Sequence, residues 1–157
     1  MKRLARLALL LFLSVAGGGM AAPTKESGTA VDATIDRLHG DHVPFRAAFD
    51  ALQRAVAAHD AAAVAALVRF PIEVNPGRAP VTIASPGQFI AQYDRIVTPA
   101  IAAVVAQQSW DALFVNAQGV MLGDGEVWLA GECADAACTA MRVRVITIQG
   151  GAHLTPQ

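Results

Sequence analysis

The chain has 157 residues, enough to bury one continuous apolar core but not two, so a single domain is expected. Hydrophobic residues make up 54% of it and charged residues 16%, which excludes a disordered polyelectrolyte. The formal net charge is −1, and loss of the three basic residues of an N-terminal leader would bring it to −4, so nucleic acid is not an expected partner.

Residues 1–21 have the three-part layout of a cleavable export signal. Basic residues stand at the start, an apolar run extends from Leu7 to Val15, and small residues follow. The apolar run is much shorter than the roughly 20 residues that cross a bilayer core, so no stable membrane anchor is expected after cleavage. We predict a cut after Ala21, because a cut after Ala22 would place Pro23 beside the scissile bond. The mature protein is then periplasmic or secreted.

The next segment, residues 22–42, is predicted to be a flexible lead-in that contains one short helix at 31–38. A single domain is expected over 43–150. Its first helix carries an apolar stripe at three- and four-residue spacing, formed by Phe45, Phe49, Leu52 and Val56. Asp60 is well placed to cap a second helix at 61–68, so a helix pair is predicted.

An extended segment follows the helix pair. Apolar and polar residues alternate over 70–75 and an extended pattern resumes at 80–83, which indicates a hairpin or a bent edge strand. Ser85 and Pro86 have the pattern of a helix start. A second proline, Pro99, restarts this helix at a new angle, so a kinked or two-part helix is predicted.

The remainder of the domain is predicted to form four strands, at 113–116, 120–122, 126–132 and 139–149. In the last of them one face is expected to be buried, and its members are Met141, Val143, Val145 and Thr147. Residues 151–157 are expected to form a frayed tail.

Two cysteines stand between the last two predicted strands. A hairpin there would bring Cys133 and Cys138 face to face, and a disulfide is the natural product in an oxidising compartment. Their four-residue gap does not match the usual zinc pair, and the chain has no second pair of ligands. We therefore expect no metal and no cofactor.

The order of these elements resembles that of the nuclear transport factor 2-like superfamily. Local sequence resembles it too, at Phe89 and in the stretches 70–75, 93–96, 98–99, 113–116 and 119–128. The likeness is to small exported bacterial proteins and covers roughly 44–149. It implies an α+β fold in which N-terminal helices pack on a curved antiparallel sheet, with an apolar pocket at the wide end of a cone. The superfamily hosts isomerases, dehydratases, hydrolases, transport adaptors and immunity proteins, so the resemblance implies a fold and no activity.

Enzymes of this superfamily use a carboxylate or an Asp–His pair in the cone as a base, which makes two acids candidates. Asp94 could take a proton while its neighbour Tyr93 directs a hydroxyl into a pocket. Glu126 and Trp128 are two apart in a predicted strand and would share a face. Each has a structural alternative: core packing for Tyr93, a cap or surface ion pair for Asp94, and an outward-facing pair for Glu126 and Trp128.

If the pocket forms, its expected ligand-binding residues are Phe89, Tyr93, Phe114 and Trp128. Three functions remain open. The first is a non-catalytic exported domain that binds a small apolar ligand or an envelope protein in its cone. The second is an isomerase- or dehydratase-type enzyme with Asp94 or Glu126 as general base. The third is an envelope adaptor or immunity-like protein, which would form homodimers or hetero-complexes.

Overall fold

The computed structural model describes residues 29–75 and 80–150. The expected export signal at 1–21 and the expected tail at 151–157 lie outside the described residues. The helices are α1 (Ala30–His39), α2 (Val43–Ala57), α3 (Ala61–Leu67), α4 (Pro86–Ala91), α5 (Tyr93–Ile96), α6 (Pro99–Gln107) and the 3-10 turn η1 (Trp110–Ala112). The strands are β1 (Ile72–Asn75), β2 (Val81–Ile83), β3 (Phe114–Asn116), β4 (Gly119–Leu122), β5 (Val127–Cys133) and β6 (Met141–Gln149).

The six strands form one sheet in the order β2-β1-β6-β5-β4-β3. The predicted α+β class is confirmed, but the sheet is mixed rather than purely antiparallel. Strand β1 pairs parallel with β6, and every other neighbouring pair is antiparallel. The reason is topological: the β1–β2 hairpin precedes the helices α4–α6 in the chain, and the last strand of the β3–β6 meander lies beside β1 and runs in the same direction.

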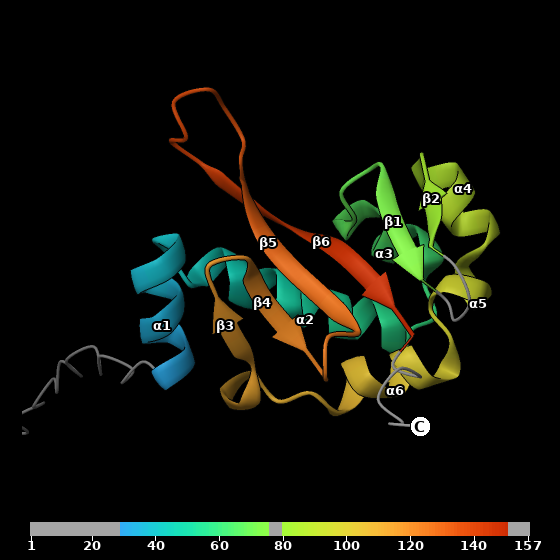
Figure 1. Ribbon diagram of the computed structural model, residues 1–157, viewed down its shortest axis with the longest axis horizontal. Helices are drawn as coiled ribbons and strands as arrows, with labels where there is room; N and C mark the ends of the chain where they lie inside the picture. Colours follow the sequence, from blue (N-terminus) through green and yellow to red (C-terminus); the bar gives the residue numbers. More distant parts are fainter. Residues whose placement is uncertain (1–28, 76–79, 151–157) are drawn as a thin grey trace, which may run out of the picture.

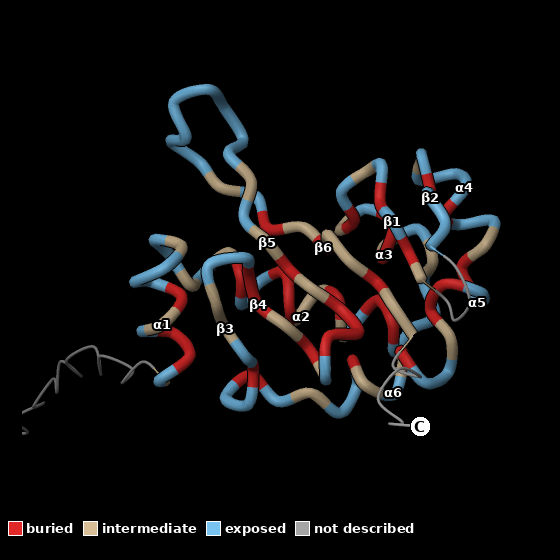
Figure 2. The backbone as a smooth tube through the Cα atoms, in the orientation of Figure 1, coloured by how far each residue is buried: buried red, intermediate tan, exposed pale blue. Residues whose placement is uncertain are grey.

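The helices pack against one side of the sheet (Figure 1). The longest, α2, contacts β5 and β6 and is flanked by α3 and α6. Its predicted apolar stripe is confirmed, since Phe45, Phe49, Leu52 and Val56 are all buried. The core therefore lies between α2 and the sheet, where the buried segments of the two layers meet (Figure 2).

Side-chain caps determine where the helices begin. Asp60 accepts a hydrogen bond from the Ala63 N–H at 2.9 Å, which confirms the predicted start of α3. Ser85 and Thr98 cap α4 and α6 in the same way. The predicted two-part helix is in fact three pieces, because the chain also breaks at Gln92, between α4 and α5.

Helix α1 belongs to the folded body, although the sequence placed it in a flexible lead-in. Ile35 is completely buried. The Trp110 indole N–H donates to Asp32 Oδ1 at 2.7 Å, and the Thr29 N–H donates to Asp32 Oδ2 at 2.7 Å. Burial raises the pKa of Asp32, but these hydrogen bonds and the Thr29 hydroxyl outweigh it and leave the pKa below its ordinary value. Packing therefore begins well before residue 43.

Strand β6 contains a β-bulge that corrects the predicted buried face. Trp128 pairs with Thr147 while Leu129 pairs with Val145, so Ile146 has no partner of its own on β5. One extra residue reverses the alternation of side chains beyond that point. Ile148 is consequently buried, and Thr147 lies on the other face with only partial burial.

Beyond the body, β5 and β6 continue as a projecting hairpin, residues 131–141, which we call the arm (Figure 1). Residues 133–140 are all exposed (Figure 2). Cys133 and Cys138 form the predicted disulfide there.

In the described part of the chain, none of the helices is long and apolar enough to span a membrane.

Candidate binding face

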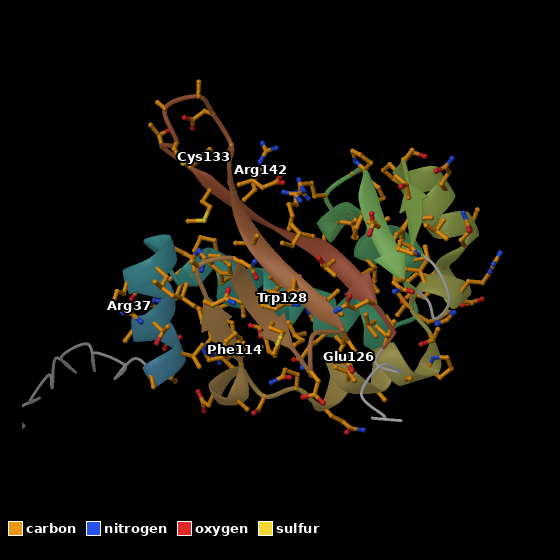
Figure 3. The ribbon with its side chains drawn as sticks, in the orientation of Figure 1. Arg37, Phe114, Glu126, Trp128, Cys133 and Arg142 are labelled. Atoms are coloured by element: carbon orange, nitrogen blue, oxygen red, sulfur yellow. A yellow bond between two sulfur atoms is a disulfide. The ribbon has the colours of Figure 1, made fainter. Side chains whose placement is uncertain are left out.

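The sheet has one packed face and one open face, and alternation along β4 and β5 decides which residues lie on each. Val120, Leu122, Val127 and Leu129 are buried beneath the helices, while Met121 and Trp128 between them are only partly buried. Among the described elements, no helix covers the side on which Trp128 and Phe114 lie (Figure 3). We call this side the open face.

Three large side chains and a threonine form a continuous row across the open face. Phe114 is directly opposite Met121, Met121 is opposite Trp128, and Trp128 is opposite Thr147. Directly opposed residues lie within contact distance on one face of a sheet. We call these four residues the row. Its outer member, Phe114, is 52% exposed, which is unusual for a phenylalanine held in a regular strand.

Beyond one side of the row, toward the arm, the open face is basic. Arg142 is opposite Glu132, and Arg144 is opposite Ala130. Arg69 Nε approaches Glu132 Oε1 at 3.4 Å. Arg142, at the base of the arm, is exposed and has no ion pair within the described part of the chain. Three arginines thus stand with a single glutamate, and we call this region the basic end.

Beyond the other side of the row, the β4–β5 turn is acidic. Asp124 is exposed, and its N–H donates to Glu126 Oε2 at 2.6 Å. Gly123 has a φ of +64°, and a Cβ there would lie 2.3 Å from the Glu126 carboxylate and 2.6 Å from Val104, so a larger residue would be strained at this position. We call residues 123–126 the acidic end, and they form the turn that the Gly-Asp-Gly pattern predicted.

The structure separates Glu126 from Trp128. Glu126 precedes β5 and is 9% exposed, with its carboxylate hydrogen-bonded inside its own turn and next to Val104 of α6. Trp128 lies on the open face (Figure 3). The period-2 argument failed because the strand begins one residue after Glu126. The two side chains therefore do not form an acid–indole pair.

A shallow pocket of about 140 Å³ adjoins the row where β1 meets β6. Its lining residues are Glu73, Val74, Asn75, Pro80, Ile146, Thr147, Ile148 and Gln149. Thr147 links this pocket to the row, while Gln149 is held by a 2.8 Å hydrogen bond from its side-chain N–H to the Gly125 carbonyl. The pocket is too small to enclose a drug-sized ligand.

The four predicted ligand-binding residues fall into two separate groups. Phe89 and Tyr93 are buried on α4 and α5 with ring centroids 6.2 Å apart, so they belong to the core. Phe114 and Trp128 lie on the open face. The Tyr93 hydroxyl has no hydrogen-bond partner among the described residues, and burial, with the nearby charges of Asp94 and Asp60, raises its pKa.

Asp94 contacts His59, a partner that the sequence did not indicate. Its Oδ1 lies 3.0 Å from His59 Nε2, and the His59 ring packs edge-on against Tyr93. No spacing signal in the sequence connects His59 to Asp94, because tertiary packing alone brings α5 to the end of α2. Their side chains are 72% and 80% exposed, so this Asp–His pair lies on the surface rather than in a cavity.

One group of side chains has the composition of a metal site. Ligand atoms of Asp36, Asp41 and His42 lie within 4.8 Å of one another between α1 and α2. His42 Nδ1 is 2.8 Å from Asp36 Oδ1, and this hydrogen bond raises the pKa of His42. The Asp41 carboxylate accepts the Val43 N–H at 2.9 Å. These contacts give all three side chains a structural role at the α1–α2 junction.

Comparison with known proteins adds no assignment, since no family model, curated protein or solved structure matches this chain. The open face is therefore judged on its own chemistry.

Proposed function

We propose that this protein is an exported, non-catalytic domain that binds a protein partner through the open face of its sheet. The observation that carries the proposal is the row, in which Phe114, Met121 and Trp128 stand side by side on three adjacent strands. A chain that folds only for itself gains nothing from leaving such groups in water, because burial of apolar area is the main favourable term in folding and association.

The shape of the row favours a protein over a small apolar ligand. Its four members span three inter-strand spacings, about 14 Å, on an open sheet. Small ligands are held in concave pockets that enclose most of their surface, whereas protein interfaces are broad, apolar at the centre and polar at the rim. The row, with charged groups on both sides of it, has the second arrangement.

Export is supported by two independent features. The first 21 residues have the layout of a cleavable signal, and the Cys133–Cys138 disulfide suits an oxidising compartment. Intact-mass spectrometry of the periplasmic fraction of a bacterial host should give a chain that begins at Ala22. Recovery of the uncut chain from the cytoplasm would contradict export.

Site-specific photo-crosslinking in the living host tests the binding face. A photoreactive phenylalanine analogue replaces Phe114, and a matched variant carries it at Val43, which is 60% exposed on α2 away from the open face. We expect a discrete covalent protein adduct from position 114 and none from position 43. No adduct from either position would overturn the proposed function.

One observation favours a second candidate, an isomerase- or dehydratase-type enzyme that would use an acidic base as nuclear transport factor 2-like enzymes do. Asp94 is paired with His59 beside the unpartnered Tyr93 hydroxyl. Glu126, the other proposed base, is engaged by its own turn. Solvent deuterium uptake by a panel of ketones, followed by NMR, separates the candidates: Asp94→Asn abolishes catalysed exchange only if Asp94 is a base.

A further inference from the structure

The row leads into the pocket at the seam between β1 and β6. The two strands run parallel, with Val74 paired to Ile148, and both of these residues are buried on the packed face. The residues just before them, Glu73 and Thr147, are therefore neighbours on the open face. Both line the pocket of about 140 Å³. A carboxylate thus stands one strand beyond the last member of the row.

The β-bulge of β6 accounts for a hollow at this seam. Ile146 is the extra residue of the bulge, and β1 pairs with β6 only beyond it, at Val74 and Asn75. A bulge interrupts the hydrogen-bond ladder and bends its strand, so the two strands do not close against each other beside it. Ile146 forms part of the wall. The hollow that results has room for one side chain of a partner rather than for a whole ligand.

The charge of this pocket is negative. Among the described residues that line it, Glu73 is the only charged one. Glu73 is exposed and has no ion pair within the described part of the chain. Arg144, the preceding arginine on β6, donates to the Ala66 carbonyl and is not part of the lining. The Thr147 hydroxyl adds a hydrogen-bond acceptor. The pocket therefore suits a positively charged group.

Trp128 supplies an aromatic surface next to the pocket. It is paired with Thr147, which lines the pocket. A Cβ on Gly125 would lie 3.8 Å from the indole Nε1 of Trp128 and 3.3 Å from Nε2 of Gln149, so these two side chains approach the same point. Gln149 also lines the pocket. Indole rings attract cations more strongly than other aromatic rings do, and they pack well against the aliphatic stems of long basic side chains.

We infer that the partner anchors itself on the open face with one arginine side chain, whose stem lies along Trp128 and whose guanidinium enters the pocket to meet the Glu73 carboxylate. This inference rests on the proposed function and names the chemistry of the partner at that same face. Arginine fits better than lysine, because its planar guanidinium both stacks on an aromatic ring and donates two hydrogen bonds to one carboxylate. We call this side chain the anchor.

NMR of the two tryptophan indoles tests the anchor with a small probe, N-acetyl-L-arginine methylamide. The indole N–H of Trp110 is held by Asp32 in the core and serves as the internal control. We expect the probe to shift the Trp128 signal, which a Trp128→Phe variant assigns, and to leave the Trp110 signal in place. The neutral probe N-acetyl-L-citrulline methylamide, which has nearly the same shape, should bind about fivefold more weakly. Equal Kd values for the two probes, or an unshifted Trp128 signal, would overturn the inference.

A charge change in the protein tests the role of Glu73. Glu73→Gln should weaken binding of the arginine probe about fivefold, to the level of the citrulline probe on the wild type, because the same charge pair is removed from the other side. Glu132→Gln makes the same change at the basic end and should leave both Kd values as they are. Thermal melts confirm that both variants are folded. Equal losses in the two variants would reveal a general effect of net charge and contradict the anchor.

The anchor and the proposed function fail separately. With the photoreactive residue at position 114, Glu73→Gln should weaken the protein adduct. An undiminished adduct, together with no preference for the arginine probe, keeps the proposed function and overturns the anchor. No adduct from position 114 overturns the proposed function and the anchor with it.

Discussion

The two faces of the sheet are formed by the same strands, yet their side chains differ in how far they are buried. On the packed face, Val120, Leu129 and Val145 are at most 1% exposed. On the open face their neighbours in sequence, Met121 and Trp128, are only partly covered, and Phe114 is half exposed. The packed face accounts for the fold of one chain. The open face leaves apolar area of Phe114 exposed, and the proposed partner would cover it.

The largest effect should separate the two faces directly. Phe45→Ala removes a fully buried ring from α2 and should lower the free energy of unfolding by about 3–5 kcal/mol. Phe114→Ala removes the same atoms from the open face and should cost about 1 kcal/mol or less. Urea denaturation at two protein concentrations measures both losses and separates any contribution of association. Equal losses would mean that the open face is part of the folding core.

A smaller effect is expected where α1 joins the body. Asp32→Asn removes the carboxylate that accepts hydrogen bonds from Trp110 and Thr29, which should cost about 1.5–3 kcal/mol at pH 7. Because folding lowers the pKa of Asp32, its contribution is present above the ordinary carboxyl pKa of about 3.9 and is lost as the pH falls through the folded value.

Denaturation curves of wild type and Asp32→Asn between pH 2 and 7 measure this contribution. The two stabilities should differ most at neutral pH and converge in acid. A difference that does not change with pH would show that the carboxylate charge contributes nothing, and no difference at any pH would show that the apolar residues Val31 and Ile35 are enough to hold α1.

The smallest effect is expected in the arm. Replacing Cys133 and Cys138 with serine opens a short loop, so the loss should be about 2 kcal/mol or less. It should also be local: the Ala134 N–H, which donates to the Ala140 carbonyl at 2.8 Å, should lose protection from hydrogen exchange. Amides of β5 near Leu129 should keep theirs. Loss of protection throughout β5 would show that the arm supports the packed face after all.

Local patterns predicted most of the elements. The stripe that begins at Phe45, the cap at Asp60 and the hairpin between Cys133 and Cys138 depend on neighbours in the chain, and the structure confirms each of them. The bulge at Ile146 and the start of β5 at Val127, one residue after Glu126, could not be predicted, because each depends on how two strands fit across the sheet.

In the candidate site, too, local sequence predicted some features while others depend on tertiary packing. The sequence predicts one pocket lined by Phe89, Tyr93, Phe114 and Trp128. Whether a ring lies inside or outside depends on which face of the sheet the helices cover. Phe89 and Tyr93 ended in the core, and Phe114 and Trp128 on the open face.

Local sequence signals were enough to predict the α+β class, the caps at Asp60 and Ser85 and the disulfide, because hydrophobic period, capping and cysteine spacing act within a few residues of the chain. The continuity of the row, the contact of His59 with Asp94 and the placement of basic and acidic ends on opposite sides of one face emerge from the folded chain. These relations join residues far apart in the chain, and strand register and layer packing, rather than local preference, bring such residues together.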